Sequence, residues 1–193
     1  MKKSFLKKVS KKFSAFTEEE QWLQTMVQNG WILKKYSDEG EGGCSYIFEP
    51  IQKKDVIYKI DFREFNRKKD YQEYKDLFED TGWKLLSKNQ SYSKHIFYTS
   101  STNKQSDIFS DAPSYIEREK RKMSASLRDA IIYLVISCIC LALRIIFERT
   151  SFYGPSGLFL IISIKYVMDY LKHRKTYKSL IGKGNQFKKQ PIS

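Results

Sequence analysis

The chain has 193 residues, of which 41% are hydrophobic and 30% are charged, with a formal net charge of +13. This composition excludes both an intrinsically disordered chain and a protein built mainly of membrane-spanning helices. The charge is unevenly spread: residues 1–12 carry six lysines, residues 13–116 carry 14 basic and 17 acidic residues, and residues 117–193 carry 15 basic and five acidic ones. A nucleic-acid-binding face needs cations on the folded domain, so we expect no direct nucleic-acid partner.

Residues 1–12 form a basic N-terminal segment. No apolar stretch follows these lysines, so the segment does not have the pattern of a secretory signal peptide. Two interpretations stay open. The segment lies on the anionic inner leaflet of a membrane, where each lysine contributes about 1 kcal/mol, or it is a solvated tail.

Residues 13–116 are expected to form a cytoplasmic domain in which one order of motifs occurs twice. A capping box begins at Thr17 and opens a helix that ends at Asn29-Gly30, and a strand follows; the helix that ends at Thr81-Gly82 is also followed by a strand. Aromatic strands then come at 45–48 and 95–98, and period-two alternation marks 56–62 as a strand. With a weaker strand at 12–16, the unit is β-α-β-β, twice. This predicts an α+β, two-layer sandwich with one antiparallel sheet and both helices on one face.

The runs EEEQWLQTMVQNGWILKKY, VIYKIDF, YKDLFEDTGWKLL, HIFY and DIFSDAPSYIEREKR resemble the domain of unknown function 2812 family of Firmicutes, over about residues 8–122. The resemblance implies C-terminal membrane helices and a PadR-like transcriptional regulator encoded nearby. It implies no catalytic residues.

A basic juxtamembrane linker, 117–129, precedes a predicted transmembrane hairpin at 130–171, with spans at 130–147 and 152–171. A basic tail, 172–193, follows. Lysines and arginines flank the same end of both spans, which places both termini in the cytoplasm of a two-span cell-membrane protein. The alternative is a buried helical hairpin in a soluble protein.

Three charged residues fall inside or near the ends of the predicted spans: Arg144, Lys165 and Asp169. Long side chains can reach the membrane interface, and Lys165 and Asp169 have the i, i+4 spacing of an ion pair. These residues either reach the interface and pair with each other, or they pair with helices of another membrane subunit.

The sequence offers little for catalysis or metal binding. Its two histidines, His95 and His173, have no nucleophile motif beside them, and the three cysteines have no metal-ligand spacing. Asp61 is expected to point outward from its strand and Asp80 to end a helix. We therefore expect no enzyme activity, no cofactor and no metal.

Aromatic residues, 15% of the chain, are dense in the polar domain. They exceed what one sheet face can bury, so some are expected on a helix-free face that binds an apolar ligand or a partner; a second buried face is the alternative. The candidate binding residues are Trp31, Tyr36, Tyr46, Phe48, Tyr58 and Trp83. The expected function is a membrane-anchored sensing or interaction module that binds a transcriptional regulator or an apolar ligand. An accessory subunit of a membrane complex such as a transporter is the alternative.

Overall fold

A computed structural model describes residues 5–37, 44–52, 55–87, 89–102, 112–147, 151 and 153–187, without the side chains of 112–113 and 183–187. The chain divides into two compact units, Met1–Asp111 and Ala112–Ser193, which are described separately. The segment 39–43, whose three glycines predict a hairpin turn, lies outside the described residues. So does most of the segment between the two predicted spans, 148–151.

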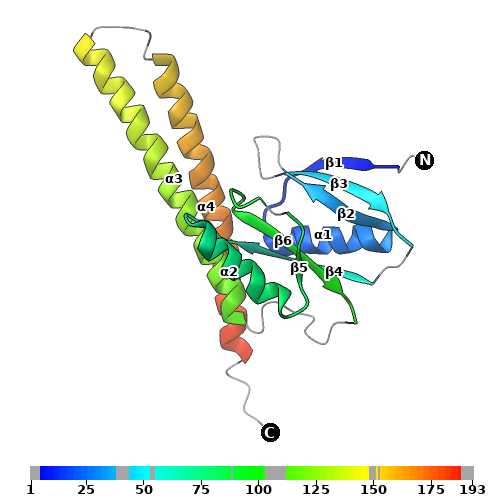
Figure 1. Cartoon of the computed structure of the whole chain (residues 1–193). Coiled ribbons are helices and arrows are strands. Elements are labelled where there is room, and N and C mark those ends of the chain that lie inside the picture. Colours follow the sequence, from blue (N-terminus) through cyan, green and yellow to red (C-terminus); the bar gives the residue numbers. More distant parts are fainter. Residues whose placement is uncertain are drawn as a thin grey trace. The chain divides into compact units, whose positions relative to one another are not determined.

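The first unit repeats one order of elements (Figure 1). The first repeat contains β1 (Lys7–Lys11), α1 (Phe16–Gln28), β2 (Trp31–Tyr36) and β3 (Cys44–Pro50), and the second contains β4 (Val56–Phe62), α2 (Lys68–Glu79), β5 (Lys84–Leu85) and β6 (Lys94–Ser100). The predicted β-α-β-β duplication is therefore confirmed.

The single predicted sheet is wrong, because each repeat forms its own three-stranded antiparallel sheet. The strand orders are β1-β3-β2 and β4-β6-β5. In both sheets the last strand of the repeat takes the centre, so strands of the same repeat already pair with both of its edges. The two halves cannot then join through their central strands, and they pack by side chains instead.

The helix stops follow the predicted chemistry. Gly30 and Gly82 both have φ of 82°, a conformation that glycine adopts without a steric penalty, and each precedes a tryptophan that leads into or opens the next strand. The predicted capping box is wrong: Ala15 is the N-cap of α1. The Glu18 carboxylate accepts the Ser14 N–H at 3.2 Å, and Glu20 is used elsewhere.

The first strand lies earlier than the expected 12–16, since Lys7–Lys11 pairs with β3 from Lys7 opposite Phe48 to Lys11 opposite Cys44. Part of the basic N-terminal segment, 1–12, thus belongs to the folded domain. Only Val9 of this strand is half-buried, so the lysine-rich sequence shows no alternation that would reveal a strand.

Side chain to backbone hydrogen bonds from α1 and to β2 help to join the two halves. The Glu20 carboxylate accepts the Ile60 N–H at 3.0 Å, the Gln24 amide donates to the Val56 carbonyl at 3.2 Å, and the Tyr58 hydroxyl accepts the Leu33 N–H at 2.9 Å. Helix α1 of the first repeat therefore packs against β4 of the second (Figure 1).

The second unit consists of α3 (Ala112–Phe147) and α4 (Tyr153–Phe187), of 36 and 35 residues. They lie side by side and antiparallel, because contacts pair rising positions in α3 with falling positions in α4: Glu119 with His173, Ala130 with Ser163, and Ser137 with Ser156.

Of the described helices, α3 alone, at Ser114–Phe147, is long and apolar enough to cross a membrane. Core helices of soluble proteins can also meet this criterion, but only 11% of the most apolar stretch of α3 is buried. Helix α4 does not meet it, since Lys165 and Asp169 interrupt its apolar run.

Candidate functional site

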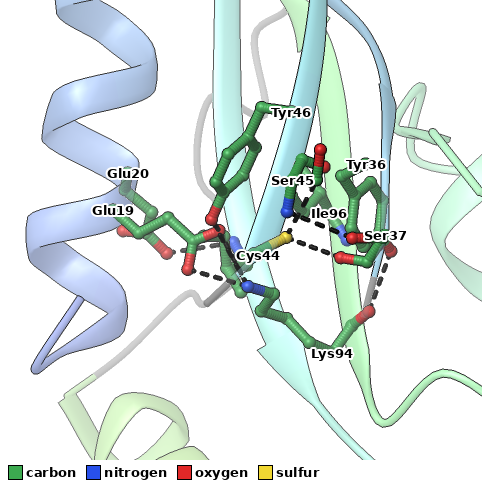
Figure 2. Close-up of polar contacts among 10 residues, drawn as sticks. Glu19, Glu20, Tyr36, Ser37, Cys44, Ser45, Tyr46, Lys94 and Ile96 are labelled. Atoms are coloured by element: carbon green, nitrogen blue, oxygen red, sulfur yellow. Dashed lines mark hydrogen bonds and ion pairs between the residues drawn. The ribbon is translucent and has the colours of Figure 1, made fainter. Parts of the chain in front are cut away.

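A buried polar cluster lies where the two repeats meet (Figure 2). The ammonium of Lys94, on β6, lies 3.1 and 3.2 Å from the carboxylate oxygens of Glu19, on α1. The hydroxyl of Tyr46, on β3, donates to the same carboxylate at 2.5 Å. These three side chains are at most 2% exposed, so the charges of Glu19 and Lys94 compensate each other in a dry interior.

The cluster holds its hydroxyl and thiol protonated. Burial and the neighbouring Glu19 charge raise the pKa of Tyr46, which keeps its hydroxyl a donor. Burial also raises the pKa of the Cys44 thiol, against a smaller lowering by Lys94. The thiol donates to the Ser37 carbonyl. A neutral, buried thiol is a poor nucleophile, so this arrangement stabilises the junction and lacks the access that a substrate needs.

Tyr36, on β2, bonds to the backbone on either side of His95 at this cluster. Its hydroxyl donates to the Lys94 carbonyl at 2.8 Å and accepts the Ile96 N–H at 3.3 Å, which fixes the first repeat to the start of β6 (Figure 2). The same residue lines an open groove. Because Tyr36 is only 1% exposed, its hydroxyl stays inside the domain while the residue borders the groove.

The groove has a volume of about 490 Å³ and takes residues from both repeats. Ile47 lies opposite both Lys8 and Lys35 in the strand pairing, and opposite residues share a sheet face. Tyr46, on the other face, packs against Trp22 of α1 at 4.9 Å between ring centroids. The groove thus involves the helix-free face of the first sheet. Its lining residues are Leu6, Lys34, Lys35, Tyr36, Ile47, Leu86 and Ser87.

The predicted aromatic binding residues are mostly core residues. Five of them are at most 3% exposed, so the expectation of an exposed aromatic face is wrong for Tyr36, Tyr46, Phe48, Tyr58 and Trp83. Two sheets and two helices supply more buried faces than the single expected sheet. Trp31 is half-exposed beneath the ammonium of Lys7, 5.2 Å from the ring centroid. Tyr36 is the member of the predicted set that lines the groove.

Sequence reasoning missed the other groove residues for a physical reason. The pairing of β2 with β3 shifts register between Leu33 and Lys35, and this bulge brings Lys34 and Lys35 to the same groove. Strict alternation would place them on opposite faces. The adjacent lysine pair ahead of Tyr36 is a visible but weak signal.

The residues considered for catalysis make structural contacts. Asp61, expected to point outward, is instead 1% exposed and accepts the Tyr74 hydroxyl at 2.9 Å. His95 is buried, with Nε2 3.0 Å from the Arg63 carbonyl, and Asp80 caps α2 as expected. Within the described part of the chain, no group of three or more His, Cys, Asp or Glu residues could hold a metal ion.

The charged residues of the hairpin take different partners from those predicted. The Asp169 carboxylate lies 3.7 Å from the ammonium of Lys172, so the expected pair with Lys165 does not form. The Arg144 guanidinium lies 3.9 Å from the ring centroid of Tyr153, a cation–π contact across the hairpin. Glu119 and His173 meet at 2.6 Å between α3 and α4.

The hairpin is inverted relative to a soluble helix pair, because small and polar side chains face inward and large apolar ones face outward. Ala130, Ser137, Ser156 and Ser163 are at most 5% exposed. Ser137 and Ser163 donate to carbonyls of the opposite helix at 2.8 Å. Large apolar residues at least 42% exposed follow both helices, including Ile131, Val135, Ile139, Ile145, Leu158, Ile161, Ile164 and Met168.

Comparison with known proteins gives a family and no further relatives. No curated protein and no solved structure matches the chain. The model of a family described as "Protein of unknown function (DUF2812)" matches residues 15–131, which cover the polar domain from the start of α1 and the basic first part of α3. The chain therefore belongs to the DUF2812 family, as its motifs predict.

Proposed function

We propose that the protein is a membrane-anchored sensing and interaction module. A two-span hairpin holds the duplicated domain at the cytoplasmic side of the cell membrane, and the groove between the repeats binds the partner or ligand. The observation that carries this proposal is the groove itself, which is lined by residues from both halves.

The inverted packing of the hairpin supports two spans rather than one. Exposed isoleucines and leucines on α4 match those on α3, and membrane helix pairs pack through small residues while large apolar ones face lipid. Water would penalise this outward apolar surface. The Arg144 and Lys165 side chains would then reach an interface along their apolar stems.

The helices exceed the membrane in length, and their charged ends favour one orientation. At 1.5 Å per residue, α3 and α4 are about 54 Å and 52 Å long, against about 30 Å of hydrocarbon. The protruding ends carry Lys120, Arg121 and Lys122 on α3 and Lys172, Arg174, Lys175 and Lys178 on α4. Basic residues stay on the cytoplasmic side, so both termini are cytoplasmic and the basic ends adjoin anionic lipid.

The groove suits a sensor because a molecule bound there would lie next to the contacts that join the two repeats. Tyr36 borders the groove, and its buried hydroxyl bonds to the backbone at Lys94 and Ile96. A change at Tyr36 would alter how the first sheet meets β6. The partner that would read this change is a PadR-like transcriptional regulator, sequestered at the membrane.

The test is site-specific photo-cross-linking of the full-length protein in native membranes. A photoreactive amino acid replaces Leu6 in the groove, or Lys69 on the exposed face of α2 as a control. We expect a discrete cross-linked product from position 6 and none from position 69. Absence of a product at 6, or the same products from both positions, would contradict groove binding.

The exposed apolar surface of the hairpin favours a second candidate function, an accessory subunit of a membrane complex such as a transporter. In that case Arg144, Lys165 and Asp169 would contact partner helices. Neutralising Lys165 and Asp169 together should abolish co-purification of the membrane partner. Unchanged co-purification would exclude this role for the two charges.

A further inference from the structure

We propose that the groove between the repeats binds the anionic end and first part of a single acyl chain, a fatty-acid carboxylate. This rests on the proposed function and names the ligand class of its site. The ligand would bind with its carboxylate against Lys35 and its chain against Leu6, Ile47 and Leu86.

Charge in the groove favours an anion with a single negative charge. Lys34 is engaged by Glu49, with 2.7 Å between the ammonium and the carboxylate. Among the described residues, no carboxylate forms an ion pair with Lys35, whose side chain is exposed. One uncommitted ammonium matches one carboxylate. A phosphate carries more charge and is commonly held by the forked donors of arginine, and the lining contains none.

The rest of the lining favours an acyl chain over a polar metabolite. Leu6, Ile47 and Leu86 supply aliphatic surface. Beside the lysines, Ser87 supplies a hydroxyl, so few side-chain groups are available to orient a sugar or a nucleotide. A volume of about 490 Å³ lies within the range of roughly 300–1,000 Å³ typical of small-molecule sites.

An acyl chain in the groove would also cover apolar surface that water now reaches. Leu6 is 50% exposed and Phe5, next to it in the chain, is 75% exposed. Burial of aliphatic surface is favourable in proportion to the area removed from water, which gives the chain an affinity that the carboxylate alone would lack. The groove would therefore discriminate against short carboxylates such as acetate.

The experiment uses purified full-length protein in phosphatidylcholine nanodiscs and the fluorescent fatty acid cis-parinarate, displaced by palmitate. We expect saturable binding that Lys35→Glu weakens by at least tenfold and that Ser87→Trp, which fills the groove, abolishes. Lys69→Glu makes the same charge change on an exposed part of α2 and should bind like the wild type. Thermal unfolding by circular dichroism must show that the three variants fold alike.

Three results would overturn the proposal: no saturable binding to the wild type, equal binding by Lys35→Glu and Lys69→Glu, or binding that survives Ser87→Trp. Methyl palmitate, which lacks the charge, should compete at least tenfold more weakly than palmitate. Equal competition would also contradict the role of Lys35. A cross-link at position 6 in native membranes without parinarate binding would overturn the ligand class alone, whereas absence of both would overturn the groove as a site.

Discussion

The ammonium of Lys94 contacts both carboxylate oxygens of Glu19, at 3.1 and 3.2 Å, across 75 residues of sequence. Glu19 belongs to the helix of the first repeat and Lys94 to the central strand of the second. The pair therefore joins the two halves of the domain at a point from which water is excluded.

Removing Lys94 alone should be strongly destabilising. Lys94→Met leaves the Glu19 charge buried and uncompensated, and we expect a loss of about 3–5 kcal/mol in the free energy of unfolding. The double variant Lys94→Met/Glu19→Leu should recover much of this loss. Urea unfolding followed by tryptophan fluorescence measures both. Lys69→Met, which breaks an exposed pair on α2, is the control and should cost less than about 1 kcal/mol; an equal effect at the two lysines would contradict the buried role.

Alkaline pH should destabilise the domain through Tyr58. Burial raises the pKa of Tyr58 from its ordinary value of 10.0 to about 12, so the folded state keeps this proton where the unfolded state loses it. Stability is then fully present below pH 10 and is lost as the pH rises towards 12, by on the order of 3 kcal/mol. The raised pKa of Tyr46 acts in the same direction.

Tyr58→Phe tests this contribution. The variant should lose about 1 kcal/mol at neutral pH, because the Leu33 N–H loses its acceptor. Between pH 10 and 12 its free energy of unfolding should fall less steeply than that of the wild type. Parallel pH profiles for the two proteins would show that Tyr58 does not carry the alkaline loss.

The left-handed backbone at Gly30 should make this position sensitive to a side chain. With φ of 82°, Gly30→Ala should cost about 1–2 kcal/mol of stability. The added Cβ would meet the Ile51 carbonyl at 3.5 Å, an ordinary contact, so the cost comes from the backbone conformation and not from a clash. Gly30→Asn should cost less, since asparagine tolerates this conformation. Thermal unfolding compares the two variants, and a larger loss of stability for Gly30→Asn than for Gly30→Ala would contradict this explanation.

Substitutions between α3 and α4 should destabilise the hairpin more than substitutions on its outer surface. Ser163→Leu removes the hydrogen bond to Ala130 and inserts a large side chain between the helices, which should loosen the pair. Ile161→Leu, at a position 67% exposed, should have little effect. Proteolysis of the two variants in nanodiscs measures this difference, and equal protection of both would argue against a close-packed α3–α4 contact.

The duplication could be predicted because the same kinds of residue end the helix in both repeats. A polar residue and a glycine end each helix at 29–30 and 81–82, and a tryptophan follows at once. These are local signals, and they place the elements within a few residues. The sheet boundary is different, since strand partners are chosen by competition between distant segments and no local pattern records the outcome.

The candidate site escaped prediction for two distinct reasons. Lys94 looks like a surface residue at the start of a strand, and only the placement of Glu19 in the tertiary structure makes its burial possible. The groove depends on the register shift at Leu33 and Lys35, which changes which face the lysines share. The aromatic residues are dense in the domain, as expected, but most of the predicted binding residues among them fill its core.

The buried cluster also bears on how the two repeats came to differ. Cys44 and Lys94 each open the central strand of their sheet, so they occupy equivalent positions in the two repeats, and Lys94 lies near enough to influence the Cys44 thiol. In a symmetric pair of identical subunits, a position on the twofold axis meets its own copy, and two lysines there would repel each other. Fusion into one chain removes that restriction, so one repeat can contribute the cation and the other a neutral thiol.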